Sequence, residues 1–273
     1  MICFPNAKIN LGLDVVRRRA DGYHDIETVM YPVRALRDAL EFVPSGKSDE
    51  LHLSGLKVPG DNGDNICLKA LALLREDYEI PPLRIYLHKA IPMGAGLGGG
   101  SADAAFLLSA LNAHFSLGLD QPALESRAAT LGADCAFFVA NQPAFAEGIG
   151  NLLTPVEEML EGLHIAVVHA GLHISTAAAY AKIHPKQPAS SAQQVVHSHP
   201  VSQWRHHLIN AFEAHAFETF PALRIFRDKL YHAGAAYAAM TGSGSAVFGL
   251  FEEAPPKDLA GQMDVPFFFS ARL

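Results

Sequence analysis

The amino-acid sequence predicts an α+β fold, in which strands and helices are segregated along the chain. Three observations predict it. Residues 9–15 alternate apolar and polar side chains, which is the period of a strand. Residues 83–112 have the pattern of a strand, a glycine-rich loop and a helix, and residues 237–269 return to short strands separated by glycine turns. With 273 residues, 49% of them hydrophobic, the chain can form one large domain or two ordinary ones.

The first part of the chain is predicted to be rich in antiparallel strands. In the strand at 9–15, Lys8 and Asn10 share one face. Asp21 and Gly22 then form a typical hairpin turn signal. Further elements up to residue 156 are expected as strands at 28–33, 39–43, 51–53, 83–87, 144–150 and 152–156, helices at 66–78, 101–112 and 122–131, and a turn at 59–65.

The composition changes at residues 184–203, which are rich in Pro, Ser, Gln and His. This composition predicts a long loop or hinge. The elements around it are expected as a strand at 165–169, helices at 204–218 and 221–232, and strands at 237–240, 246–251 and 265–269.

Charge and cysteine content narrow the class of protein. The net charge of −7 argues against a nucleic-acid or anionic-membrane partner, so any phosphate site has to be local. The three cysteines are widely spaced and lack a CxxC pair, so they suggest neither a disulfide framework nor a thiolate zinc site, and we expect a reducing cytoplasm as the location. We expect no signal peptide and no membrane span, because no apolar run approaches about 18 residues.

The stretch PMGAGLGGGSADAA, at 92–105, is the strongest local signal. Five glycines within residues 94–100 are costly in backbone entropy, and they predict a loop that brings backbone close to a ligand. A helix with Ser101 as a plausible N-cap follows the loop. Amide groups and the positive end of a helix dipole together predict a phosphate site.

Two other glycine motifs fit this loop poorly. Gly94 to Gly99 matches the dinucleotide pattern GxGxxG, but Pro92 interrupts the approach and Asp120 is followed by a helix rather than ending a strand. A Walker loop is excluded because no Gly-Lys-Ser/Thr ends the stretch.

The loop resembles the second motif of the GHMP small-molecule kinases. AKINLGL at 7–13 and TGSGSAVFGLF at 241–251 fit two further motifs in the expected order. The resemblance extends from residue 2 to about 252. Within the family, three longer segments resemble those of the kinases that act on a diphosphocytidyl substrate. They are AKINLGLDVVRRRADGYHDIETV, LGADCAFFV and AFAEGIGNLLTPV.

The resemblance implies a fold and an activity. It implies a domain like ribosomal protein S5 domain 2 at 1–155 and a ferredoxin-like domain at 156–273, with the active site in the cleft between them. The implied reaction is ATP-dependent phosphorylation of the 2-hydroxyl of 4-diphosphocytidyl-2-C-methyl-D-erythritol, in the non-mevalonate route to isoprenoid precursors. The implied cofactors are ATP and Mg²⁺, and the chain is expected as a monomer or homodimer.

Asp134 and Lys8 match the family's catalytic pair. A carboxylate can take the proton of the acceptor hydroxyl, and a nearby ammonium keeps that carboxylate ionised. Without the resemblance, Asp134 would be an ordinary helix-end carboxylate and Lys8 a solvated strand lysine. Asp103 is assigned no catalytic role, and Cys135 is expected to be a small buried side chain rather than a nucleophile.

The remaining site residues are likewise implied by the resemblance. Those expected at the nucleotide are Asn65, Lys89, Pro92, Gly94, Gly96, Leu97, Gly98, Gly99, Gly100 and Ser101, with the Ser101 hydroxyl also a candidate Mg²⁺ ligand. Those expected at the cytidylyl substrate are Asn10, Tyr23, His24, Tyr180, Gly242 and Ser243. Tyr23 and Tyr180 are predicted to sandwich the cytosine. Asn65 could equally be only a helix cap, and Tyr180 an ordinary helix aromatic.

Two alternatives stay open at this point. One is a GHMP kinase for another small alcohol, such as homoserine or mevalonate. The other is a non-catalytic nucleotide-binding protein, which the presence of both Lys8 and Asp134 disfavours because binding alone does not need that pair.

Overall fold

The computed structural model describes residues 1–58 and 62–273, and these residues form two compact units. Unit 1 comprises residues 1–7, 36–93 and 98–142, and unit 2 comprises residues 8–35, 94–97 and 143–273. The units interleave along the sequence and therefore differ from the predicted domains at 1–155 and 156–273, whose boundary stays a prediction. Within the described residues, no helix has the length and apolar character to cross a membrane.

Unit 1 contains one four-stranded sheet in the order β1-β4-β6-β5. Its elements are β1 (Ile2–Cys3), β4 (Ala39–Pro44), β5 (Glu50–Gly55), η1 (Asn62–Asp64), α1 (Ile66–Arg75), β6 (Leu83–Lys89), α2 (Gly99–Phe115), α3 (Gln121–Leu131) and α4 (Cys135–Ala140). The prediction of antiparallel strands is wrong for β5, which pairs with β6 in parallel. The chain between them passes through α1, and such a crossover is what a parallel pair requires.

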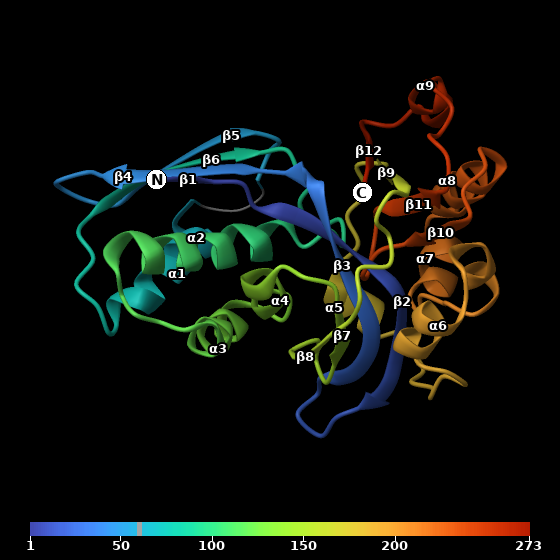
Figure 1. Cartoon of the computed structure of the whole chain (residues 1–273), viewed down its shortest axis with the longest axis horizontal. Coiled ribbons are helices and arrows are strands. Elements are labelled where there is room, and N and C mark those ends of the chain that lie inside the picture. Colours follow the sequence, from blue (N-terminus) through green and yellow to red (C-terminus); the bar gives the residue numbers. More distant parts are fainter. Residues whose placement is uncertain (59–61) are drawn as a thin grey trace. The chain divides into compact units, whose positions relative to one another are not determined.

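Helices cover one face of this sheet, as Figure 1 shows for α1 and α2. Along β6, Leu83, Ile85 and Leu87 are buried, while Tyr86 and His88 are exposed. The buried side chains join a core with leucines of α1 and α2, so the alternation seen in the sequence fixes which face is covered. Of the predicted turn at 59–65, residues 59–61 lie outside the described residues.

Unit 2 contains two four-stranded sheets, β2-β3-β7-β8 and β10-β11-β9-β12. Their strands are β2 (Asn6–Arg18), β3 (His24–Arg37), β7 (Ala144–Glu147), β8 (Leu152–Pro155), β9 (His164–His169), β10 (Tyr237–Met240), β11 (Val247–Phe251) and β12 (Phe267–Arg272). The helices are α5 (Thr176–Tyr180), α6 (Ala192–Ser198), η2 (Val201–His206), α7 (Glu213–Thr219), α8 (Pro221–His232) and α9 (Leu259–Met263).

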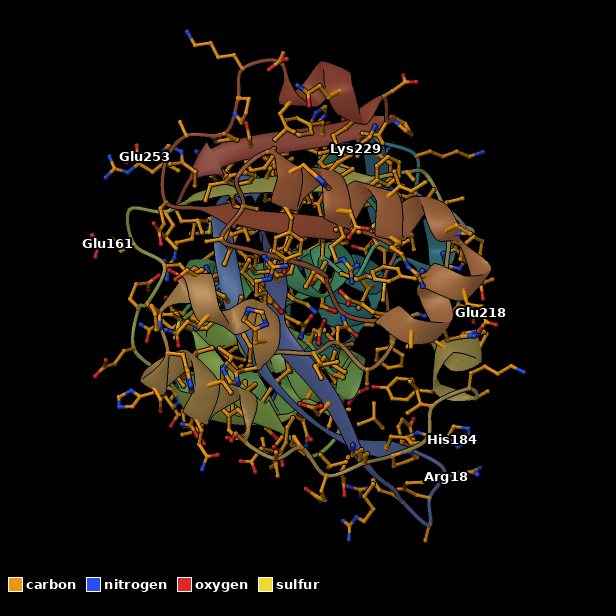
Figure 2. All side chains as sticks on the ribbon, turned by 90° about the vertical axis from the view of Figure 1, so that its right-hand side faces the viewer. Arg18, Glu161, His184, Glu218, Lys229 and Glu253 are labelled. Carbon is orange, nitrogen blue, oxygen red and sulfur yellow. The ribbon has the colours of Figure 1, made fainter. Side chains whose placement is uncertain are left out.

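The core of unit 2 lies between the second sheet and its helices. Leu223 and Leu230 of α8 pack with Met240 of β10 and Val247 of β11. Charged side chains of unit 2 project outward instead, as Figure 2 shows for Arg18. This separation makes the few buried polar groups of unit 2 conspicuous, and they carry the site described below.

Helix predictions around residue 200 are partly wrong. Residues 184–203 are not one long loop, because α6 forms with a capping box in which Ser191 and Gln194 each bond the other's backbone N–H. The helix expected at 204–218 is interrupted, and α7 begins only at Glu213. Between them the chain pairs with β2: the Leu13 N–H donates to Ile209 O at 2.8 Å and the Ala211 N–H donates to Leu13 O at 2.8 Å. Tertiary pairing here overrides helix propensity.

The start of α2 also differs from the prediction. The helix begins at Gly99, with Gly98 as its N-cap, so Ser101 lies inside the first turn and is not the cap. The predicted helix at 221–232 is confirmed as α8, and the helix predicted at 122–131 is confirmed as α3.

We expect the stability of the protein to depend on pH through the buried carboxyl group of Glu213. It accepts the Met240 N–H at 2.7 Å, and burial raises its pKa from 4.5 to about 6. Its contribution to stability is therefore fully present below pH 4.5 and is lost as the pH rises through 6. Glu213→Gln removes this titration, so the variant should gain about 1 kcal/mol of unfolding free energy relative to the wild type between roughly pH 5 and 8. Urea unfolding of the wild type and the variant, at roughly pH 5 and roughly pH 8, measures this difference in unfolding free energy. If the difference between the two proteins is the same at both pH values, the assignment to Glu213 is contradicted.

Candidate active site

Lys8 and Asn10 lie on one face of β2, as predicted, but this face is not solvated. Their exposed fractions are 3% and 2%. The Lys8 ammonium donates to Asn10 Oδ1 at 2.6 Å. A buried lysine held by a hydrogen bond is costly to desolvate, which argues against the ordinary reading of Lys8 as a surface strand residue.

Two threonines extend this buried network, and sequence reasoning missed both. Asn10 Nδ2 donates to Thr28 Oγ1 at 3.2 Å, and Thr28 Oγ1 donates to Gly12 O at 2.5 Å. The Asn10 N–H donates to Thr241 Oγ1 at 3.1 Å. Thr28 and Thr241 are each 0% exposed. Because both side-chain polar atoms of Asn10 are hydrogen-bonded in this way, the side chain is held in place next to the Lys8 ammonium.

The glycine segment of unit 2, residues 94–97, is seated against the same network. The Lys8 N–H donates to Leu97 O at 2.9 Å, and the Ala246 N–H donates to Ala95 O at 3.0 Å. Thr241 Oγ1 also lies 3.1 Å from Gly96 O. A Cβ on Gly96 would lie 2.0 Å from Thr241 O. The glycine at this position is therefore required by close approach of the chain to itself.

The rest of the glycine loop forms the start of α2 in unit 1. Gly98 has φ +72° and no side chain caps the helix. The N–H groups of the first turn and the dipole of this 17-residue helix make its N-terminus electropositive. A Cβ on Gly100 would touch Met93 and Ile66, which follows Asn65, so the starts of α1 and α2 adjoin. This adjacency brings two predicted nucleotide residues, Asn65 and Gly100, together.

Asn65 caps α1, because its Oδ1 accepts the Cys67 N–H at 2.9 Å. The helix-cap reading is thus confirmed, and its contact with a nucleotide stays a prediction. Pro92 is buried at the entry to the loop, and its role likewise stays a prediction.

Asp134 occupies the N-cap position of α4, but its carboxylate does not cap the helix. The next residue, Cys135, is fully buried, and burial raises the pKa of its thiol to about 11, although a hydrogen bond with Ser101 opposes this. A thiol so buried is a poor nucleophile. The contact also places the Ser101 side chain beside the start of α4, which carries Asp134.

Lys89, expected at the nucleotide, has a buried side chain, and its contact with the nucleotide stays a prediction. Its side chain is 0% exposed and its ammonium donates to both Asp38 and Asp103. Burial tends to lower the pKa of Lys89, but the two carboxylates outweigh it and the pKa is raised. Burial raises the pKa of Asp103 to about 8, and the neighbouring Asp38 carboxylate acts in the same direction while Lys89 opposes it. Sequence reasoning gave Asp38 and Asp103 no part in the site.

Aromatic residues predicted at the cytosine lie in unit 2. The rings of His24 and Tyr180 stack, with centroids 5.0 Å apart and planes 24° apart. Tyr180 also meets the edge of Phe212, at 4.9 Å. Tyr23 is 63% exposed on the turn before β3. The stacked pair in the structure is His24 with Tyr180, and the sandwich formed by Tyr23 and Tyr180 stays a prediction.

The turn at 241–245 is held by Asn210, another residue that sequence reasoning missed. Asn210 Nδ2 donates to Met240 O at 2.8 Å and to Gly242 O at 2.9 Å. Asn210 is 2% exposed, so both bonds are shielded from water. Ser243 Oγ lies 3.0 Å from Thr176 Oγ1 of α5. Gly242 and Ser243 are thereby fixed, while their contact with substrate stays a prediction.

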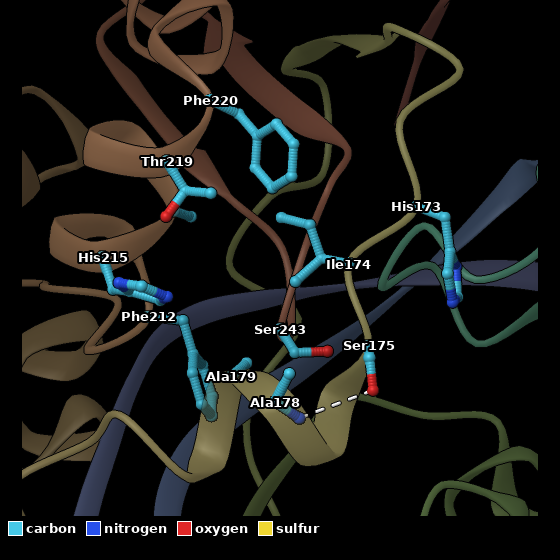
Figure 3. A pocket seen from close by; sticks show the side chains of 11 residues that line it. His173, Ile174, Ser175, Ala178, Ala179, Phe212, His215, Thr219, Phe220 and Ser243 are labelled. Carbon is cyan, nitrogen blue, oxygen red and sulfur yellow. Dashed lines mark hydrogen bonds between the residues drawn. The ribbon is translucent and has the colours of Figure 1, made fainter.

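A cavity of about 200 Å³ opens beside Ser243 in unit 2. Figure 3 shows it between the start of α5 and the α7 region, with Ile174, Phe212 and Phe220 forming apolar walls. The volume is below that of a site for a whole nucleotide-sized ligand, so this cavity can take only a fragment. A Cβ on Gly94 would meet His173, which lines the cavity, at 2.9 Å.

The fold and these motifs define a class of protein. Residues 65–148 match the family described as GHMP kinases N terminal domain, and residues 202–264 match GHMP kinases C terminal. The chain belongs to the GHMP kinase family, which confirms the predicted resemblance and fold class. The matched ranges contain the glycine loop, Asp134 and the turn at 241–245.

Similar proteins within the family carry the name of one particular kinase. The chain is 49% identical over 255 residues to the 4-diphosphocytidyl-2-C-methyl-D-erythritol kinase of Bacteroides thetaiotaomicron, with 92% of each chain covered. It is 48% identical to the enzyme of the same name from Porphyromonas gingivalis, with 97% of each covered. Among solved structures, 4-(cytidine 5'-diphospho)-2C-methyl-D-erythritol kinase matches with a TM-score of 0.81 at 33% identity, covering 99% of this chain and 98% of that one.

A more distant structure shows the fold alone. Mevalonate kinase of Methanococcus jannaschii matches with a TM-score of 0.70 at 16% identity, covering 100% of this chain and 98% of that one. At this identity the likeness extends to the arrangement of elements and not to the substrate.

Proposed function

We propose that this chain transfers the γ-phosphoryl group of ATP to the 2-hydroxyl of 4-diphosphocytidyl-2-C-methyl-D-erythritol, a reaction of the non-mevalonate isoprenoid route. The observation that carries the proposal is the identity of 48–49% to kinases of that name, over more than nine-tenths of each chain. The chain is a small-molecule kinase, and ATP is its phosphoryl donor.

Asp134 is the proposed general base and Lys8 its cationic partner. The base takes the proton of the attacking hydroxyl, and the ammonium stabilises charge on that oxygen. The buried network supports this assignment of Lys8, because Asn10 and Thr28 hold the side chain in place instead of leaving it to solvent. Asp134 is supported by its match to the family's catalytic aspartate and by its position at the start of α4, beside the Ser101 side chain.

The backbone of Gly94–Gly100 is proposed to cradle the phosphates of ATP. Its N–H groups and the α2 dipole supply the electropositive end that anions prefer. Binding to backbone explains how an acidic chain, with a net charge of −7, accepts a polyanion without a general basic surface.

Mg²⁺ is proposed to enter with the nucleotide. Among residues 1–58 and 62–273, no group of three or more His, Cys, Asp or Glu side chains could hold a metal ion. A site with few protein ligands suits Mg²⁺, which commonly binds phosphate oxygens and water in addition to one or two protein groups. The Ser101 hydroxyl, in the first turn of α2, is the proposed protein ligand. When bound, the ion would neutralise charge that develops on the transferring phosphoryl group.

Substrate recognition is assigned to unit 2. Tyr23, His24 and Tyr180 are proposed to bind the cytosine by stacking and by hydrogen bonds to its edge, and Asn10 to contact the methylerythritol. Gly242 and Ser243 complete the proposed substrate site. The proposed location is the cytoplasm, with the chain as a monomer or homodimer.

An acceptor comparison tests this proposal. ADP release, coupled to NADH oxidation, should be rapid with ATP and 4-diphosphocytidyl-2-C-methyl-D-erythritol. With homoserine or mevalonate we expect rates at least about a hundredfold lower, because neither alcohol carries the cytidylyl group that the site would hold. Turnover of homoserine or mevalonate without turnover of the cytidylyl substrate would refute the proposal.

A further inference from the structure

Three buried charged side chains of unit 1 meet where the glycine loop joins the fold. Lys89 ends β6, and its Nζ donates to Asp103 Oδ2 at 2.5 Å and to Asp38 Oδ2. The three side chains are 0%, 3% and 0% exposed. We name Asp38, Lys89 and Asp103 the Lys89 triad.

The first contact of the triad is with the chain that enters the loop. Asp38 Oδ1 accepts the Ala90 N–H at 2.6 Å and the Ile91 N–H at 2.9 Å. Its other oxygen accepts from Lys89. Asp38 thus fixes three consecutive residues directly before Pro92.

The second contact is with the chain that leaves the loop. Asp103 lies in the second turn of α2. A Cβ on Gly99, the first residue of α2, would lie 3.4 Å from Lys89 Nζ and 2.9 Å from Ile91 Cγ2. The ammonium therefore lies directly beneath the first turn of α2. A single cation links both stems of the glycine loop.

Burying the Lys89 triad has a high desolvation cost, so stability alone does not explain it. Two carboxyl groups and one ammonium are removed from water, and Asp103 Oδ1 is buried with no hydrogen-bond partner among the described residues. Well-packed apolar side chains often stabilise such a location as well or better. An arrangement of this kind is instead suited to fixing one geometry of the elements that it joins.

We propose that the Lys89 triad positions the glycine loop for ATP. It holds the first turn of α2 against the end of β6, and so sets where the backbone amides of the cradle point. Lys89 acts through the backbone of Gly99 rather than by touching the nucleotide, since its side chain is fully buried. This inference rests on the proposed kinase function for the nature of the ligand, and it makes all three members positioning residues.

Direct binding of ATP to the whole chain, by isothermal titration calorimetry without acceptor, tests the triad. Asp103→Ala should weaken ATP binding about tenfold or more and raise the KM for ATP equally, because misplaced amides lose their alignment. The KM for the alcohol substrate should change less than about twofold, because its proposed contacts lie in unit 2. Asp103→Asn keeps an acceptor for Lys89 and should restore ATP binding to within about threefold of the wild type.

A double variant separates positioning from stability. Lys89→Met with Asp103→Leu replaces the Lys89–Asp103 ion pair by apolar groups and leaves Asp38 held by the Ala90 and Ile91 N–H groups, so its Tm should exceed that of Lys89→Met alone while its ATP affinity stays low. Asp49→Ala is the matched control: it breaks the Asp49–Arg75 ion pair of unit 1, and should lower Tm without changing ATP affinity.

Three outcomes overturn the inference. They are wild-type ATP affinity in the double variant, loss of Tm without loss of affinity in Asp103→Ala, and failure of Asp103→Asn to rescue binding. If Asp103→Ala does not fold, the double variant decides alone. ATP binding does not depend on the acceptor, so these results stand apart from any failure to phosphorylate the cytidylyl substrate.

Discussion

Replacing Asp134 by asparagine is expected to reduce kcat by about a thousandfold while leaving the fold and ATP affinity unchanged. The amide has the shape of the carboxylate but cannot accept the hydroxyl proton, and general-base catalysis is commonly worth 10²–10⁴ in rate. The fold should survive because asparagine keeps the shape and one acceptor oxygen of the aspartate, and the Asp134 side chain does not cap α4. Steady-state kinetics, together with calorimetric ATP binding and a thermal melt, measure all three quantities.

The matched control is Asp120→Asn. Asp120 also stands at an N-cap position, of α3, but its side chain does cap the helix by accepting the Ala123 N–H at 3.0 Å. Asparagine caps nearly as well as aspartate, so activity should stay within about twofold of the wild type. If Asp134→Asn retained activity within a few-fold of the wild type, Asp134 could not be the base.

The second large effect is expected at Gly96. A Cβ there would lie 2.0 Å from the carbonyl oxygen of Thr241, and the backbone φ of +79° is itself unfavourable for alanine. Gly96→Ala should therefore push the loop away from the turn at 241–245, lower stability by more than about 2 kcal/mol and reduce kcat/KM at least about a hundredfold. Chemical unfolding and steady-state kinetics measure the two effects.

Gly118→Ala controls for backbone strain. Gly118 has a similar φ of +75°, but a Cβ there would have no atom within 4 Å. The control should lose only about 1 kcal/mol and keep its activity. Equal losses in the two variants would mean that the left-handed backbone, and not the contact with Thr241, explains the effect of Gly96→Ala.

Local sequence patterns predicted a strand or helix best where the side chains that determine it lie close together in the sequence. Alternation at 9–15 identified β2, and the apolar spacing between Pro221 and Gly234 identified α8. The family predicted from three motifs is confirmed by the comparisons, and the role of the glycine loop as a backbone cradle stays a prediction.

What sequence reasoning missed was set by contacts between distant residues. Thr241 meets Gly96 across 145 positions and Asp38 meets Lys89 across 51, and no local pattern records either pair. Asn210 lies in a stretch whose apolar spacing predicts a helix. In the structure its backbone pairs with Leu13 instead, and no local pattern indicates that pairing.

One missed feature did have a signal in the sequence. Lys89 continues the buried alternation of Leu83, Ile85 and Leu87, so the strand pattern already placed its side chain on the covered face. A lysine in that phase needs a buried anion. The expectation that Lys89 serves the nucleotide came from the family resemblance and stays a prediction, while the strand pattern predicts a buried side chain.

The phosphorylated product tests the central claim most directly. The chain is incubated with ATP and 4-diphosphocytidyl-2-C-methyl-D-erythritol, and the product is followed by ³¹P NMR with proton-coupled assignment of the phosphorylated carbon. We predict one new phosphate monoester on the 2-oxygen, equimolar with ADP, with the cytidine diphosphate group intact. ATP consumption without that monoester, or a monoester on another oxygen, would contradict the account.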